Sequence, residues 1–349
     1  MRVLIFHTGS LGDTLVAVPS MWLIRKNFPD AQIDLISNVP SRKKLVQAKE
    51  ILDGSGLIDN FLEYCRSDYK SIFKLLIKIR FKPYDKLVYL IRIKNSIERV
   101  NRDMRIFRCA GIKNFIGMEG FHPQPRVRDK PLPQSLKVAE ELLNRLRISG
   151  LNVPDLEKLR WDININSRER EKVNQLISKL PVDGGRRWIA MGISSKMLCK
   201  IWPFQRYQEV LEKLISEYNI WPVFFGGPED ENDARKMVCN IGRGYVFAGK
   251  LSIRESAAAM ERCWFYLGND CGIMHLAVSA GLKSVALFSA REAPGAWFPY
   301  GEGHQILRES VQCEGCMLEV CREQQMKCLL SISSEQVLNA CHTAISTQH

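Results

Sequence analysis

The sequence predicts an α/β protein built on parallel, doubly wound sheets. Residues 2–6 and residues 263–267 each form a short apolar run that stops at a polar loop and leads into a helical pattern. Buried parallel strands read as continuous apolar runs of this kind. Between residues 188 and 262, strand and helix patterns alternate regularly. Such alternation is typical of a parallel sheet with helices on its faces.

The first strand, residues 2–6, is followed by a Gly-containing loop from His7 to Asp13 and by an amphipathic helix at residues 14–28 that contains Pro19. The loop has neither the G-x-G-x-x-G spacing of dinucleotide-binding proteins nor the G-K-[ST] ending of a P-loop. The sequence therefore supports neither NAD binding nor NTP hydrolysis. Asp13 follows the carboxyl end of this strand, where open α/β sheets place ligands and catalytic groups.

A change of pattern between residues 150 and 185 predicts a domain boundary. A basic helix at residues 135–148 ends at Gly150, an irregular stretch with Pro154 and Pro181 follows, and a buried strand occupies residues 188–192. A chain of 349 residues that is 46% hydrophobic can bury two α/β cores. We therefore expect two domains, residues 1–165 and 166–331, and a C-terminal helical tail at residues 332–349.

The second half continues as an alternating series of elements. We expect helices at residues 205–218, 230–239 and 253–262 and strands at residues 222–225, 245–247 and 263–267. The last strand runs into Gly268, Asn269 and Asp270, and the first turn of the next helix contains Gly272 and His275. Free N–H groups and a partial positive charge make such a helix start a site for phosphate. An ordinary turn with Asp270 as a helix cap is the alternative.

Four segments together resemble one known family. They are HTGSLGDTLVAVPSMWLIRKNFPDAQIDLIS from His7, KIWP from Lys200, FFGGPEDEND from Phe224 and GNDCGIMHLAVSAGLKSVALF from Gly268. In residues and in order they are similar to the ADP-heptose:lipopolysaccharide heptosyltransferases of glycosyltransferase family 9, over almost the whole chain. The resemblance implies the GT-B architecture, in which two Rossmann-like domains face each other across a cleft. It also implies metal-independent, inverting transfer of a sugar from a nucleotide diphosphate.

The resemblance implies roles for individual residues as well. Asp13, in the LGD motif, matches the family's catalytic base, and Lys200 matches its phosphate-binding lysine. The remaining donor positions would be Ser194, Ser195, Glu231, Leu251, Asp270, Cys271, Gly272 and His275, with Glu229 as an alternative to Glu231. The acceptor positions would be His7, Gly9, Ser10, Leu11, Gly12, Arg99 and Arg102. At position 7 the family usually has Lys or Arg, so the charge of His7 depends on its surroundings.

Positive charge is concentrated in the first half of the chain. Residues 1–150 contain 27 Lys and Arg against 15 Asp and Glu, whereas residues 151–349 contain 23 of each. Two helical stripes contribute, one with Arg99, Arg102, Arg105 and Arg108 and one with Lys70, Lys74 and Lys78 among apolar residues. An anionic glycolipid or glycan acceptor, an anionic membrane surface or a merely solvated helix face would each account for them. Since zinc-finger spacing, an RNP-like motif and a basic recognition helix are missing, we expect no nucleic acid partner.

Neither a secretory signal nor an apolar run long enough to span a bilayer is visible, so we expect a cytoplasmic protein, at most peripheral on the inner face of the cell membrane. The implied reaction requires no cofactor. Four of the 11 cysteines, Cys313, Cys316, Cys321 and Cys328, lie close together in sequence. Similar patterns occur in relatives of the family, one of them an iron-binding cysteine finger. Zinc or iron, local disulfides and free thiols all fit this spacing, which matches no standard zinc finger.

Three functional hypotheses follow. The first is a heptosyltransferase that uses ADP-heptose and builds a lipopolysaccharide core or a related glycan, with Asp13 as general base. The second is a glycosyltransferase of the same fold with a different nucleotide-sugar donor or a protein acceptor. The third is a non-catalytic glycan-binding or nucleotide-binding protein, which the intact Asp13, Lys200 and G-N-D loop disfavour.

Overall fold

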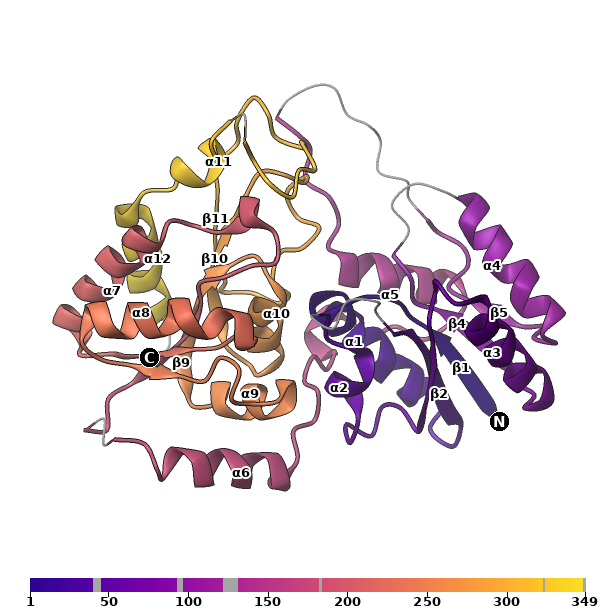
Figure 1. The fold of residues 1–349 in the computed structure, drawn as a ribbon. Coiled ribbons are helices and arrows are strands. Elements are labelled where there is room, and N and C mark those ends of the chain that lie inside the picture. Colours follow the sequence, from indigo (N-terminus) through magenta and orange to yellow (C-terminus); the bar gives the residue numbers. More distant parts are fainter. Residues whose placement is uncertain (40–44, 93–96, 122–130, 182–183, 323, 348–349) are drawn as a thin grey trace. The chain divides into compact units, whose positions relative to one another are not determined.

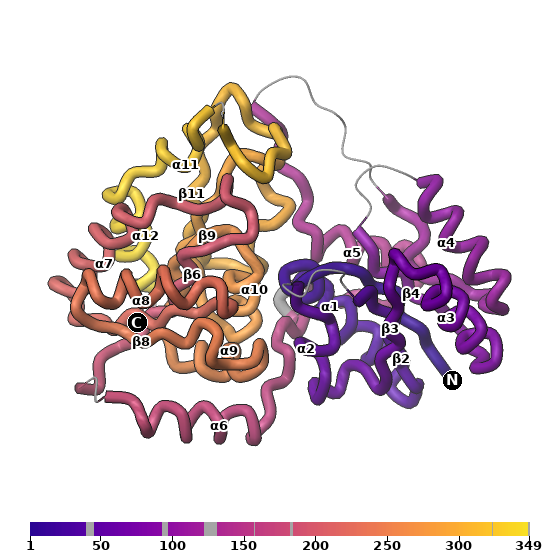
Figure 2. Tube along the Cα trace, viewed as in Figure 1, coloured from indigo at the N-terminus to yellow at the C-terminus, as the bar shows by residue number. Residues whose placement is uncertain are grey.

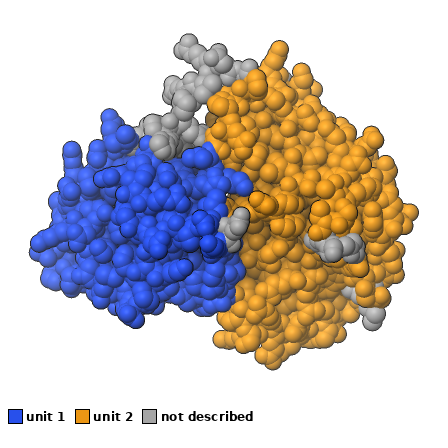
Figure 3. Space-filling model, turned by 180° about the vertical axis from the view of Figure 1, so that it is seen from behind, with its two compact units in different colours: residues 1–126, 136–164 blue, residues 127–135, 165–349 orange. Residues whose placement is uncertain are grey.

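The structure is a computed structural model that describes residues 1–39, 45–92, 97–121, 131–181, 184–322 and 324–347. It divides into two compact units (Figure 3). Unit 1 comprises Met1–Arg126 and Leu136–Asn164, and unit 2 comprises Val127–Ser135 and Ile165–His349. Each unit is built on one parallel sheet with helices packed against it (Figure 1), which confirms the predicted α/β class.

Unit 1 contains a five-stranded sheet in the order β3-β2-β1-β4-β5. Its strands are β1 (Arg2–Phe6), β2 (Gln32–Asn38), β3 (Asn60–Tyr64), β4 (Lys86–Tyr89) and β5 (Phe115–Ile116). Its helices are α1 (Leu11–Asn27), α2 (Ala48–Leu52), α3 (Tyr69–Phe81), α4 (Ile97–Cys109) and α5 (Val138–Ile148), followed by a 3₁₀ turn, η1 (Leu156–Lys158). α1 packs against α2 and α5, whereas α3 and α4 share one apolar cluster on the other face of the sheet (Figure 1).

The buried side chain of Arg145 in α5 bonds to the backbone at the carboxyl ends of β4 and β5. The residue is 1% exposed, and its guanidinium donates to the carbonyl oxygens of Tyr89 at 2.6 Å, Ile91 at 2.9 Å and Gly117 at 2.6 and 3.0 Å. Burial lowers the pKa of this arginine to about 10, so it stays charged at neutral pH. These bonds tie the ends of β4 and β5 to α5.

Unit 2 contains a six-stranded sheet in the order β11-β10-β9-β6-β7-β8. Its strands are β6 (Trp188–Gly192), β7 (Trp221–Phe224), β8 (Tyr245–Val246), β9 (Cys263–Asn269), β10 (Lys283–Phe288) and β11 (Gln305–Arg308). Its α-helices are α6 (Ser167–Ile177), α7 (Phe204–Tyr218), α8 (Glu231–Ile241), α9 (Ile253–Met260), α10 (Gly272–Ser279), α11 (Lys327–Leu330) and α12 (Ser334–Ser346). Two 3₁₀ turns lie in loops that follow strands, η2 (Leu198–Lys200) and η3 (Pro228–Asp230).

The C-terminal helix α12 is an integral part of unit 2. It lies beside α7 in both views (Figures 1 and 2) and contributes five side chains to the apolar core: Val337, Leu338, Cys341, Ala344 and Ile345. Residues 131–135 join unit 2 as well, because the Leu132 N–H donates to Glu314 Oε1 at 2.6 Å and the Ser135 N–H donates to the Pro294 carbonyl at 2.7 Å. Within the described ranges, no helix is both long enough and apolar enough to cross a membrane.

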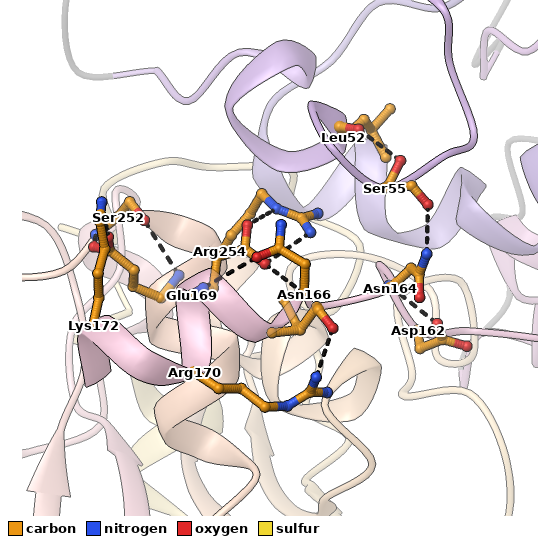
Figure 4. Close-up of polar contacts among 12 residues, drawn as sticks. Leu52, Ser55, Asp162, Asn164, Asn166, Glu169, Arg170, Lys172, Ser252 and Arg254 are labelled. Atoms are coloured by element: carbon orange, nitrogen blue, oxygen red, sulfur yellow. Dashed lines mark hydrogen bonds and ion pairs between the residues drawn. The ribbon is translucent and has the colours of Figure 1, made fainter. Parts of the chain in front are cut away.

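The last passage of the chain from unit 1 to unit 2 lies between Asn164 and Ile165, and hydrogen bonds fix it on both sides (Figure 4). In unit 1, Asn164 Nδ2 donates to the Ser55 carbonyl at 2.9 Å. In unit 2, Asn166 caps α6, and Glu169 in the first turn of that helix pairs with Arg254 of α9. The connecting residues are therefore anchored separately to each unit.

The Arg145 contacts generate a stability prediction. Arg145→Met keeps most of the apolar stem but leaves three carbonyl oxygens without this donor, so unit 1 should lose about 3 kcal/mol or more of its unfolding free energy. Amide hydrogen exchange in β4 reports unit 1 by itself. Arg147→Met, at an exposed position of the same helix, is the matched control and should change the free energy by no more than about 0.5 kcal/mol. Equal protection of the β4 amides from hydrogen exchange in the two variants would contradict the stabilising role of Arg145.

Candidate active site

In unit 1, the strand order reverses between β1 and β4, which lie side by side although β2 and β3 follow β1 in sequence. In open α/β sheets, ligands bind outside the carboxyl ends of the strands at such a point. His7 follows β1 and Leu90 follows β4, and the His7 Nδ1–H donates to the Leu90 carbonyl at 3.0 Å. The predicted catalytic loop therefore begins at the switch point of this sheet.

His7 is a neutral, buried imidazole. Its side chain is 2% exposed, and burial lowers its pKa despite the Leu90 bond and the nearby charge of Asp13. Because a carbonyl can only accept, Nδ1 carries the proton, and Nε2 accepts from the Thr14 hydroxyl at 3.2 Å. His7 thus supplies no positive charge where the resembling family usually has Lys or Arg, and this resolves the question that the sequence left open.

Asp13 lies in the first turn of α1 rather than in a loop. The prediction that the helix begins at residue 14 is wrong, because Ser10 caps the helix and Leu11 is its first residue. Asp13 Oδ2 accepts from the Ser10 N–H at 3.0 Å and from the Ser10 hydroxyl at 3.2 Å, which closes a capping box. A Cβ on Gly9 would lie 2.2 Å from the Asp13 Cβ. The carboxylate is therefore held in place by the loop that precedes it.

The other predicted acceptor residues are divided between the loop and α4. Leu11 is buried, whereas Gly12 is half-buried in the first turn of α1. Arg99 and Arg102 both reach the buried Asp103, at 3.9 Å and 2.8 Å. That carboxylate also accepts from the Tyr89 hydroxyl at 2.9 Å. Part of the arginine stripe is thus neutralised within unit 1.

In unit 2, the strand order reverses between β6 and β9. The predicted donor residues follow the carboxyl ends of four neighbouring strands of this sheet. They are Ser194 and Ser195 after β6, Glu231 after β7, Leu251 after β8 and Asp270 after β9. The structure therefore brings all four loops to one edge of the sheet, with Ser194 and Asp270 on either side of the switch point.

One buried amide joins two of these loops. Asn269 is fully buried, and its Oδ1 accepts from the Trp202 backbone N–H at 3.0 Å and from the Tyr207 hydroxyl at 2.9 Å. The end of β9 is thereby bound to the loop after β6 and to α7. Sequence reasoning noted Asn269 only as part of the G-N-D loop and gave no role to Tyr207, because the partners are distant in sequence.

Lys200 and Asp270 form a buried ion pair at the switch point. Lys200 Nζ lies 2.5 Å from Asp270 Oδ2, and the two side chains are 12% and 9% exposed. Burial raises the pKa of Asp270, and the Lys200 charge opposes this rise. Lys200 is therefore held inside the sheet edge by Asp270 and is not a freely solvated lysine.

Helix α10 begins directly after this pair. Its N-cap residue is Cys271 and its first residue is Gly272, so the N–H groups of its first turn lie at this edge of the sheet. His275 in the first turn is 7% exposed, and burial, with the charge of Lys200 as a further cause, lowers its pKa to about 3. A neutral imidazole, a lysine and a helix start thus lie close together in space, and the last two attract an anion.

The remaining donor positions have specific partners. The Ser194 hydroxyl bonds to the Asp230 carboxylate, and Ser195 Oγ accepts from the Met197 N–H at 3.4 Å. Glu231 pairs with Arg235 at 2.6 Å. Leu251 is half-buried just before Ser252, the N-cap of α9. The Gly249 N–H donates to the Gly226 carbonyl at 3.1 Å, which joins the loops that contain Glu231 and Leu251.

Sequence reasoning also missed a charged pair beyond β10. Arg291 is 6% exposed, and its Nη1 lies 2.6 Å from Glu292 Oε1. Both charges act on the pKa of Asp270, so they lie near it. Glu292 Oε2 accepts from Trp297 Nε1 at 2.8 Å, and the Trp297 ring meets the His275 ring edge to face. The only sequence signal for this pair is that two residues of opposite charge, Arg291 and Glu292, closely follow a buried strand.

The four clustered cysteines are free thiols. The Cys328 pKa is raised by burial and, less strongly, by the neighbouring thiols of Cys313 and Cys321, so these three lie near one another. Cys321 Sγ accepts from the Met326 N–H at 3.4 Å. Within the residues that the structure describes, however, no three His, Cys, Asp or Glu side chains are arranged to hold a metal ion.

Comparison with known proteins identifies one family. The sequence model described as Glycosyltransferase family 9 (heptosyltransferase) matches residues 106–327. The chain is 22% identical to lipooligosaccharide heptosyltransferase 2 of Campylobacter jejuni over 365 residues, which covers all of both chains.

Solved structures share the fold. A glycosyl transferase of family 9 from Veillonella parvula has a TM-score of 0.75 at 21% identity, with 99% of this chain and 97% of that chain covered. The Escherichia coli heptosyltransferase WaaC with ADP-2-deoxy-2-fluoro heptose has a TM-score of 0.65 at 15% identity, with 98% and 99% covered. TibC, described as an iron-containing dodecameric glycosyltransferase from E. coli, has a TM-score of 0.55 at 12% identity, with 100% and 77% covered.

The buried state of His275 predicts how stability depends on pH. The unfolded chain binds a proton at this side chain below a pKa near 6.5, whereas the folded protein does so only near pH 3. Acidification therefore favours the unfolded state, and between pH 7.5 and pH 5 this histidine should cost about 2 kcal/mol. Urea unfolding at the two pH values measures the loss, which His275→Gln should reduce. Asn339→Gln, at an exposed site on α12 that carries no titratable group, is the control and should leave the loss unchanged.

Proposed function

The chain belongs to glycosyltransferase family 9 and is a glycosyltransferase, and we propose that it transfers a heptose from ADP-heptose to a lipopolysaccharide core or a related glycan, with inversion and without a metal ion. The names of the relatives support the sugar and the acceptor class. The buried Lys200–Asp270 pair at the start of α10 is the observation that carries the donor assignment.

Unit 2 would bind the donor. A departing diphosphate gathers negative charge, which must be stabilised by preorganised donors and cations. The start of α10 at Cys271 and Gly272, Lys200 Nζ and the hydroxyls of Ser194 and Ser195 supply such groups along one sheet edge. Because these groups can take the charge together, the mechanism does not need a divalent cation. The joined loops with Glu231 and Leu251 would hold the ribose and the base.

Unit 1 would supply the general base. Asp13 would take the proton of the acceptor hydroxyl while that oxygen attacks the anomeric carbon from the face opposite the diphosphate, so that the C–O bond to ADP breaks as the new one forms. A base must be held in a fixed position to do this. The capping box with Ser10 and the close approach of Gly9 provide such a position.

The acceptor would lie at the loop from His7 to Gly12. The positive charge of residues 1–150 favours an anionic glycolipid or glycan. A neutral His7 and the contacts of Arg99 and Arg102 with Asp103 mean that this charge does not come from the switch point itself. We place the enzyme in the cytoplasm, at the inner face of the cell membrane, where a lipid-linked acceptor is within reach.

Asp13→Asn tests the base. The amide oxygen can still accept the Ser10 N–H, so the loop should keep its shape and ADP should bind as before. Transfer from ADP-heptose should fall by about two to four orders of magnitude. Asp30→Asn, at an exposed site, is the matched control. Turnover near that of the wild type in Asp13→Asn would rule out Asp13 as the base.

Lys200→Ala tests the donor site. Calorimetric titration in EDTA should show ADP binding to the wild type without a metal, and the variant should bind ADP about 10- to 100-fold more weakly while adenosine binding changes little. The double variant Lys200→Met, Asp270→Asn removes the pair without leaving a lone buried carboxylate and should also lose ADP affinity. Lys213→Ala, on the exposed side of α7, is the control. Loss of wild-type ADP binding in EDTA would exclude the metal-free mechanism.

A further inference from the structure

Helix α3 is apolar on two sides, of which the sheet covers one. Leu75 and Ile79 are buried against the sheet of unit 1. A second set of apolar side chains, spaced by four residues, remains exposed: Tyr69 at 86%, Phe73 at 64%, Ile77 at 40% and Phe81 at 84%. We call this set the outer stripe. Single exposed apolar residues are common, but a row of four along one helix marks an interaction surface.

A row of lysines runs beside the outer stripe. Lys70, Lys74 and Lys78 are also spaced by four residues and are exposed. In the described part of the chain, no carboxylate lies within ion-pair distance of them. Asp68 is nearby, but its side chain caps α3 by accepting from the Lys70 backbone N–H at 2.9 Å. The helix therefore presents apolar side chains and uncompensated positive charge together.

We propose that α3 docks unit 1 on the surface of an anionic lipid bilayer. Aromatic side chains favour the headgroup region, and lysines beside them can reach lipid phosphates. A helix that combines a cationic row with an apolar face lies flat in this region, and at 13 residues α3 is too short to span the bilayer. Charge complementarity selects anionic lipid as the partner. This inference does not need the proposed reaction, because lipid binding is measured without donor or acceptor.

Vesicle flotation of the full-length protein tests the proposal. Vesicles of phosphatidylcholine that also contain phosphatidylglycerol should bind the protein, whereas phosphatidylcholine alone should not, and added salt should weaken binding. Replacing Lys70, Lys74 and Lys78 by Gln should lower the affinity by about one to two orders of magnitude. Replacing Tyr69, Phe73 and Phe81 by Ser should lower it as well, even at low salt. The matched control replaces three exposed lysines of unit 2 by Gln and should bind as the wild type does: Lys179, Lys213 and Lys327.

Three outcomes would overturn the proposal. Binding that is equal in all three triple variants, or absent from both kinds of vesicle, would exclude α3 as a membrane contact. Sedimentation velocity that shows a dimer for the wild type and a monomer for the outer-stripe variant, without vesicle binding, would instead make α3 a contact between copies of the chain. Circular dichroism spectra of the variants separate loss of binding from loss of folding.

A reporter variant locates the contact. Phe73→Trp places an indole in the outer stripe, and brominated anionic lipids should quench its added fluorescence relative to the wild type. Ile177→Trp, on α6 of unit 2, is the control and should add fluorescence that the same lipids do not quench. Equal quenching of the two added indoles would show that the protein binds without α3 and would overturn the proposal.

Discussion

The buried side-chain amide of Asn269 is the contact on which the carboxyl edge of the unit 2 sheet depends. Its oxygen accepts from Trp202 and Tyr207, so it joins the end of β9 to the loop after β6 and to α7. Lys200 stands two residues before Trp202, and Asp270 directly follows Asn269. The amide therefore positions both members of the ion pair at once. An apolar side chain at position 269 would leave the Trp202 N–H and the Tyr207 hydroxyl buried without an acceptor. Each unpaired donor would then destabilise the folded state by its full desolvation free energy.

The Lys200–Asp270 pair explains how a lysine can be held in a largely buried site at which an anionic ligand could bind. A lone buried ammonium tends to lose its proton, because burial disfavours the charged form. The Asp270 carboxylate compensates this cost and fixes Nζ beside α10. An ammonium has three N–H donors, so one can stay with Asp270 while another meets a phosphate oxygen. In the proposed mechanism the aspartate of the G-N-D loop would thus act through the lysine, and the neutral His275 would add no competing charge.

Much of the fold could be predicted because buried parallel strands and their helices leave clear patterns. The predicted strand at residues 188–192 is β6, and the predicted helix at residues 205–218 is α7 with one further residue. The start of α1 was missed although the Ser10 and Asp13 spacing of a capping box is visible in the sequence. Contacts between distant residues leave no such pattern. Nothing in one sequence indicates that the Asn269 oxygen meets Tyr207 or that Arg99 and Arg102 share Asp103.

The two apolar sides of α3 show a further limit. Its residues 69, 73, 77 and 81 and its residues 72, 75, 76 and 79 both follow helical spacing, so periodicity alone cannot decide which set packs on the sheet. The structure decides it by burial. This result changes where the positive charge of unit 1 acts. His7 is neutral, and Arg99 and Arg102 turn to Asp103, whereas the lysines of α3 face solvent beside the outer stripe. In the proposed docking, the exposed part of this charge would hold unit 1 at the anionic surface that carries a lipid-linked acceptor, and would not contact the acceptor at the switch point.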